Sequence, residues 1–228
     1  MFVKTSQMSA NEAEIIPLLT TESTAAPKRA KRADAIANRE LILATAQRLF
    51  AERGIANVCM AAIAEAAGVG KGTLYRGFAN KGELCLALLD EDMRVFQNQT
   101  LQALRETHDQ PALTRVDAFL NSLVYFMEFQ APLLREAQLY GILPGEAAAR
   151  NASPHMWLPW LRTTIGILLQ QAQQNGEADN LDISYLVDAI LAPLSADLFL
   201  YQRETLGFDL ERISQGFRKL VMEGCKKR

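Results

Sequence analysis

The stretch Cys59–Phe78, CMAAIAEAAGVGKGTLYRGF, decides how the rest of the sequence is interpreted. It holds two short helical patterns on either side of Gly68-Val69-Gly70. A helix-turn-helix needs two short helices and a glycine-containing turn, because its helices cross steeply at close range. Gly68 can adopt the positive φ that such a turn requires. The spacing therefore predicts a helix-turn-helix over residues 59–78, and an ordinary helical hairpin with a solvated polar face is the alternative.

The second of these helices carries the side chains expected to face DNA. Ammonium, hydroxyl and guanidinium groups bind phosphates, and an arginine also pairs bidentately with guanine. The start of the helix adds free backbone N–H groups, which favour a phosphate. The predicted DNA-binding residues of this helix are Lys71, Gly72, Thr73, Tyr75 and Arg76.

Charge is distributed unevenly along the chain. Residues 28–82 contain ten Lys/Arg and four Asp/Glu, a balance of +6, whereas residues 83–228 contain thirteen and nineteen, a balance of −6. A basic portion on an acidic body is typical of a protein that presents one end to phosphate, although chance segregation gives the same split. Arg29 and Arg32 belong to a basic cluster that ends a tail predicted to be disordered over residues 1–35. We expect both arginines to bind DNA phosphates, a solvated charge run being the alternative.

The remaining apolar residues recur at helical spacing, and no strand alternation is evident, so the fold is predicted to be all-α. Glycine at position 54 is expected to end the first helix in a left-handed conformation, and Asn80-Lys81-Gly82-Glu83 has the form of a capping box. Later helices are predicted from Pro111, from Pro132 to about Tyr140, and over about 156–174, 183–204 and 209–224.

The N-terminal portion resembles regulators of the tetracycline-repressor type, the TetR family. The resemblance covers about residues 36–96, and its motifs are Leu49–Gly54, Ile63–Val69, Lys71–Tyr75, Phe78 and Lys81. It implies a homodimer with a three-helix DNA-binding domain at 36–96 and a helical effector-binding and dimerisation domain at 97–228. It also implies repression of a palindromic operator that a small molecule relieves.

Three departures from the family pattern bear on DNA binding. Cys59 stands where the family usually has Thr, and Gly70 where Ser is common, so two phosphate-binding hydroxyls are missing. Cysteine is a poor helix cap and a weak donor. Arg76-Gly77 replaces an aromatic or His pair. We expect Lys71, Lys81 and the basic tail to carry more of the phosphate binding, and the preferred DNA sequence to be peculiar to this protein.

Two sets of residues in the C-terminal portion have candidate roles. Bulky apolar side chains with a few polar groups around a turn-rich segment suit an effector pocket, although they suit a hydrophobic core equally well. The pocket residues are Phe126, Phe129, Gln130, Tyr140, His155 and Trp157. The apolar faces of 156–174 and 183–204 are predicted to form a four-helix dimer interface, with plain core as the alternative. The interface residues are Leu161, Ile165, Leu168, Leu186, Ile190 and Leu194.

Other function classes find little support. No catalytic motif, metal-ligand spacing or phosphate-binding glycine loop is present, so no enzyme activity, metal or cofactor is expected. Three scattered cysteines, the lack of a signal-peptide pattern and the lack of a long apolar run favour a cytoplasmic protein with no membrane partner. The expected function is a ligand-responsive regulator, a repressor whose partners are duplex DNA, an unknown small molecule and a second copy. The alternatives are a helical small-molecule-binding protein or enzyme with a vestigial DNA-binding hairpin, and an adaptor for another protein.

Overall fold

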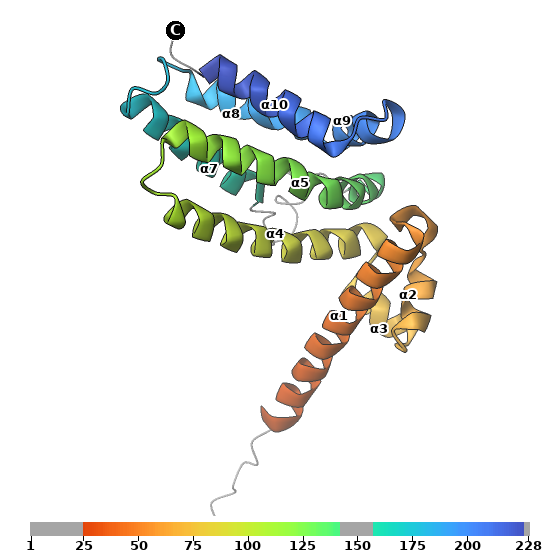
Figure 1. Ribbon diagram of the computed structural model, residues 1–228. Coiled ribbons are helices and arrows are strands. Elements are labelled where there is room, and N and C mark those ends of the chain that lie inside the picture. Colours follow the sequence, from red (N-terminus) through yellow and green to blue (C-terminus); the bar gives the residue numbers. More distant parts are fainter. Residues whose placement is uncertain (1–24, 142–156, 226–228) are drawn as a thin grey trace, which may run out of the picture. The chain divides into compact units, whose positions relative to one another are not determined.

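The computed structural model describes residues 25–141 and 157–225, and every regular element in these ranges is helical (Figure 1). The chain divides into two units, Met1–Ala37 and Asn38–Arg228. The described part of the first unit is the beginning of helix α1 (Ala25–Arg53). The expected tail is therefore helical from residue 25 onward, and the basic cluster lies on a helix.

Three helices of the second unit make a small domain. The rest of α1, α2 (Met60–Ala66) and α3 (Lys71–Gly77) surround one core, and the short 3-10 helix η1 (Ile55–Asn57) joins α1 to α2. Both expected glycine turns are confirmed, since φ is 78° at Gly54 and 66° at Gly68. The core side chains are fully buried and come from all three helices: Ile42, Leu49, Ile63, Leu74 and Phe78.

The next two helices are long and pack against each other: α4 (Lys81–Glu106) and α5 (Ala112–Leu139). The predicted capping box at the start of α4 is confirmed: the Asn80 Oδ1 accepts from the Glu83 backbone N at 2.9 Å, and the Glu83 carboxylate accepts from the Ala79 N at 2.7 Å. A separate helix from Pro132 was predicted, and this is wrong. Pro132 lies inside α5, which continues past it although proline removes one backbone hydrogen bond and crowds the carbonyl four residues earlier; the buried residues on both sides of it, such as Ala131 and Leu133, hold the helix in place.

The C-terminal helices enclose a second core together with α4 and α5. They are α7 (Trp157–Gln174), α8 (Ile183–Leu191), η2 (Ala192–Leu194), α9 (Ala196–Leu200), the π-helical segment η3 (Tyr201–Thr205) and α10 (Leu210–Cys225). Helix α5 is the centre of this arrangement, because it packs against α4, α7, α9 and α10 (Figure 1). The predicted single helix 183–204 is broken after α8, where η2 contains Pro193.

Among the described residues, no single helix is long and apolar enough to cross a membrane. One bent pair, Ile183–Leu194 with Ala196–Thr205, has the length and composition of a span, with 45° between its parts. Several of its side chains nevertheless lie in the second core, including Val187, Ile190 and Phe199.

Candidate nucleic-acid interface and effector cavity

Helix α3 presents the predicted DNA-binding residues together on one outer surface. Leu74 is fully buried and anchors the helix to the domain core. Lys71, Gly72, Tyr75 and Arg76 are exposed, and Thr73 is half-buried. The helix begins after Gly70, which provides no capping side chain. The Thr73 backbone N donates to the Gly70 carbonyl at 2.9 Å, so the N–H groups of Lys71 and Gly72 are the ones open to an external acceptor. This surface combines cationic, hydroxyl and free N–H donors, which suits it to a phosphate backbone and base edges.

Arg76 folds back along its own helix. Its Nε donates to the Gly72 carbonyl at 3.0 Å and its Nη2 to the Thr73 Oγ1 at 3.4 Å. Both contacts are solvent-exposed, so water or another acceptor replaces them at little net free energy. The guanidinium is therefore within reach of either its own helix or an external acceptor.

Arg39 is a contributor to this domain that the sequence pattern did not reveal. Its guanidinium stacks over the Phe78 ring, 4.4 Å from the centroid, and its Nη1 donates to the Gly77 carbonyl at 3.4 Å. It thus covers the C-terminal end of α3, where Gly77 has no side chain to stabilise the last turn. No sequence signal links positions so far apart, because only folding brings α1 beside the end of α3.

Lys81 was predicted to bind DNA phosphate, and the structure corrects this. Its Nζ donates to the Ile55 carbonyl and lies 3.0 Å from the Glu136 Oε1. The side chains of Lys81 and Glu136 are only 7% and 12% exposed. Because its ammonium is buried and already paired, Lys81 is not accessible to a DNA phosphate. Glu136 comes from α5, far from Lys81 in the sequence, so no local motif indicates that the two residues pair.

Arg29 and Arg32 lie in the first turns of α1. The side chains of both lie outside the described part of the chain. Their predicted contact with phosphates remains a prediction, now on a helical backbone.

Cys59 occupies the N-cap position of α2 and is exposed. Its thiol makes no capping hydrogen bond, as expected from the weak acceptor character of sulfur. The backbone N–H of Ala62, at the open start of the helix, nevertheless lowers the pKa of this thiol, because it favours the thiolate. The other two cysteines are buried, and burial raises the pKa of Cys85 to about 12 and that of Cys225 above its ordinary value.

Alkylation should therefore select Cys59. A lowered pKa means that the thiolate forms at a lower pH than in a free cysteine, and exposure gives the reagent access. We expect brief treatment of the folded protein with iodoacetamide near pH 7.5 to add one carboxamidomethyl group, mapped to Cys59 by peptide mass spectrometry. Cys59→Ser should take up none over the same time. Comparable labelling of Cys85 in the folded protein would contradict this prediction.

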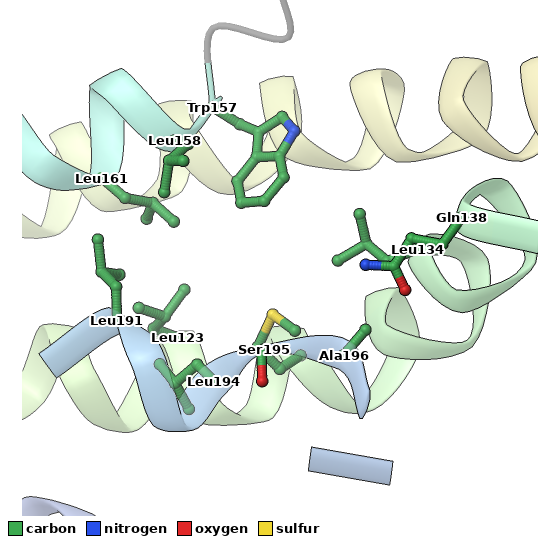
Figure 2. Close-up of a pocket in the computed structure, with 11 residues that line it drawn as sticks. Leu123, Leu134, Gln138, Trp157, Leu158, Leu161, Leu191, Leu194, Ser195 and Ala196 are labelled. Carbon is green, nitrogen blue, oxygen red and sulfur yellow. The ribbon is translucent and has the colours of Figure 1, made fainter. Parts of the chain in front are cut away.

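A cavity of about 270 Å³ lies between α5, α7 and the η2–α9 corner. In Figure 2, Trp157 and Leu161 project from α7 opposite Leu191 and Leu194, and the Gln138 amide points inward from α5. The indole Nε1 of Trp157 is buried without a hydrogen-bond partner. None of the described lining residues carries a charge; they are Leu123, Met127, Leu134, Gln138, Trp157, Leu158, Leu161, Leu191, Leu194, Ser195 and Ala196. Such a site suits an apolar, uncharged ligand group with one or two hydrogen-bonding atoms.

Of the predicted pocket residues, the structure places only Trp157 on this cavity. Phe126 stacks on Phe96 in the second core, with centroids 4.4 Å apart. Gln130 is buried and donates to the Asp92 Oδ2 at 3.0 Å. Two others lie at the surface, Phe129 at 73% exposure and Tyr140 at 47%, and His155 lies outside the described residues.

The predicted dimer-interface residues face the protein's own core, so that prediction is corrected. Leu161, Ile165, Leu168, Ile190 and Leu194 are all buried within the chain, and Leu186 is half-buried against them. Helices α7 and α8 pack against each other in one protomer, which satisfies the apolar faces expected to meet a partner. Helical periodicity shows that a face is apolar, but it does not show which chain covers it.

Known proteins resemble this chain in its N-terminal helix-turn-helix portion. Residues 42–88 match the family of bacterial regulatory proteins called the tetR family. An HTH-type transcriptional regulator of Staphylococcus aureus (strain bovine RF122 / ET3-1) is 37% identical over 99 residues, 43% of this chain and 51% of that protein. The chain thus spans about half the length of the curated relatives it matches.

Two solved structures share the fold over most of the chain. The fatty acid degradation regulator FadR from Bacillus halodurans has a TM-score of 0.60 at 20% identity, covering 83% of this chain and 97% of its own. Thermus thermophilus FadR, a TetR-family repressor in complex with lauroyl-CoA, has a TM-score of 0.59 at 21% identity, covering 83% and 96%. At these identities the likeness establishes the all-helical fold.

Proposed function

We propose that the chain, whose residues 42–88 match the tetR family of bacterial regulatory proteins, is a ligand-responsive transcriptional repressor that binds a palindromic operator as a homodimer. The observation that carries the proposal is the outer face of α3, where Lys71, Tyr75 and Arg76 are exposed while Leu74 holds the helix on its core. A recognition helix with this division of faces enters the major groove with its polar side.

The test is binding to DNA selected by the protein itself. Duplexes enriched from a random pool by the purified protein should contain an inverted repeat. Affinity for them should fall steeply as salt rises, because each neutralised phosphate releases counterions. Failure to enrich any duplex at low salt, with a folded protein, would count against the proposal.

Arg76→Ala is expected to relax base preference. The guanidinium presents two parallel N–H donors that match the O6 and N7 acceptors of a guanine, and loss of such a pair costs about 1–3 kcal/mol of discrimination. Competition between the selected duplex and random DNA measures the change. Lys71→Ala is the matched control, since a phosphate contact should weaken both DNAs alike. Equal losses on both DNAs for Arg76→Ala would remove the base-reading role.

The effector is proposed to place an apolar, uncharged portion in the cavity between α5, α7 and the η2–α9 corner. At about 270 Å³ this space exceeds the ~150 Å³ apolar cavities that hold benzene. An alkyl chain suits its leucine-rich walls, and the lauroyl-CoA held by Thermus thermophilus FadR is a ligand with such a chain. The Gln138 amide, which points into the cavity in Figure 2, is able to bind an ester, amide or hydroxyl oxygen.

Straight-chain alcohols test this ligand class. Octan-1-ol should raise the melting temperature, because a ligand that binds only the folded state stabilises it. Octylammonium, of the same length, should not, since burying its charge in an uncharged cavity is costly. A stabilisation by octylammonium equal to that by octan-1-ol would contradict the assignment.

The dimer is proposed to form through an exposed apolar face on α8 and the segments after it. Tyr185, Ala189 and Ala192 recur at i, i+4 and i+7, and all three are exposed, Tyr185 at 73%. Leu198 and Tyr201, which follow the break, are also exposed apolar side chains. A second copy that covers this face would pair two protomers, as two half-sites about 34–36 Å apart require.

A further inference from the structure

The last turns of α5 belong to both the effector cavity and the DNA-binding domain. Leu134 and Gln138 line the cavity. Leu133 is buried in the core formed by α1, α2 and α3, and the Glu136 carboxylate is paired with Lys81. Because these four residues occupy two consecutive turns of one helix, a displacement of this segment changes both sites together.

The Lys81–Glu136 pair ties this segment to the entry of the helix-turn-helix. The same Lys81 Nζ donates to the carbonyl of Ile55, in the short η1 helix that leads into α2. The ammonium also lies 5.9 Å from the centre of the Phe50 ring on α1. A single buried cation therefore joins α4, α5 and the α1–α2 connection.

Burial makes this link sensitive to position. An exposed ion pair tolerates separation because water replaces each partner, and its loss has little effect. A buried pair behaves differently, since moving one partner leaves the other charge uncompensated. A shift of Glu136 thus obliges Lys81, and with it the Ile55 carbonyl, to adjust.

We propose that the Lys81–Glu136 pair transmits occupancy of the cavity to the helix-turn-helix. The inference rests on the proposed function, since it assigns a route to the ligand response of that same cavity. An occupant between α7 and α5 displaces Leu134 and Gln138, and Glu136 moves with them. Lys81 then displaces the Ile55 carbonyl to which it is hydrogen-bonded. This displacement changes the orientation of α2 and α3 relative to the operator. Lys81 is a positioning residue in this scheme and makes no contact with DNA.

Cavity-filling substitutions test the route without a ligand. Ala196→Phe adds a ring to the cavity wall, and Ser195→Phe does so from its more exposed rim, with less demand on folding. Each is combined with Glu136→Gln, which removes the carboxylate charge but retains an oxygen for Lys81. Glu204→Gln is the matched control: it removes a carboxylate that pairs with Arg135 at the surface, where both side chains are about half exposed. Circular dichroism and light scattering verify the fold and mass of each variant.

Affinity for the selected duplex is the readout. Either filler should weaken binding by roughly tenfold in the wild-type and Glu204→Gln backgrounds, a typical allosteric coupling. In the Glu136→Gln background the same filler should change affinity for the duplex by less than about twofold. Deviations of this size from additivity are found even for mutations at independent sites. An equal tenfold loss in all backgrounds would overturn the route through Lys81 and leave the regulator intact. A folded, dimeric filler variant that binds DNA normally would overturn the coupling itself, and absence of any DNA binding by the wild type would overturn the proposed function.

Discussion

Replacing Glu136 with alanine is expected to lower the free energy of unfolding by about 3–5 kcal/mol, the usual cost of removing one partner from a buried ion pair. The Lys81 side chain is 7% exposed, and its ammonium would retain only the Ile55 carbonyl and a distant Phe50 ring. Neither neutralises its charge. For a chain of this size the loss corresponds to a fall in melting temperature of roughly 6–20 °C. Urea unfolding followed by circular dichroism measures the difference at constant protein concentration.

The double variant Lys81→Met/Glu136→Leu is the informative control. It replaces both charges with apolar groups of similar length, and such replacements of buried pairs are commonly neutral or stabilising. We expect it to recover most of the stability lost in Glu136→Ala. The exposed pair of Arg135 and Glu204 provides the comparison with a solvated ion pair. Glu204→Gln should change the free energy of unfolding by less than about 1 kcal/mol. A loss in Glu136→Ala as small as that in Glu204→Gln would show that Lys81 is not held as described.

Ala189→Asp is expected to split the proposed dimer and to abolish specific operator binding. Ala189 is exposed at the middle of the apolar face on α8, so the aspartate is solvated in a monomer. In a dimer that covers this face, two symmetry-related carboxylates would be buried without partners, at high cost. Light scattering should give half the wild-type mass. Affinity for the selected duplex should fall on the order of 10³-fold, toward the non-specific level.

Gln99→Glu is the matched control for added charge. Gln99 is exposed on α4, away from α8 in the sequence, and the substitution gives the same change of net charge. It should leave the mass and the operator affinity of the protein unchanged. If Ala189→Asp remains a dimer of full affinity, the interface lies elsewhere. If both variants dissociate, net charge rather than contact controls assembly.

Local sequence signals predicted the DNA-binding domain well. Positive φ at Gly54 and Gly68 and the capping box of Asn80 with Glu83 are confirmed, because each depends on residues within a few positions of one another. The exposed face of α3 follows from the same logic, since 3.6-residue periodicity separates Leu74 from its polar neighbours.

Predictions about residues whose partners lie far away in the sequence were wrong, because the sequence pattern around a residue does not show which other elements pack against it. From the sequence, Lys81 was predicted to be a surface cation. In the folded chain Glu136 of α5 lies beside it, and both side chains are largely buried. Leu161 and Ile165 read equally well as interface and as core, because an apolar stripe does not specify what covers it. Phe129 was expected in the effector pocket, but it lies 73% exposed on a different hollow, which residues of α1, α4 and α5 line, because only folding decides which helices face a given side chain.

By itself the sequence determined the short helices and glycine turns of the DNA-binding domain and the polar face of α3, because hydrogen bonding and periodicity within a helix are local. The tertiary structure alone decided which helices enclose the cavity, that α7 and α8 cover each other, and that Lys81 is buried against Glu136. These outcomes depend on contacts between residues far apart in the chain. Their free energy depends on burial, which no local pattern specifies.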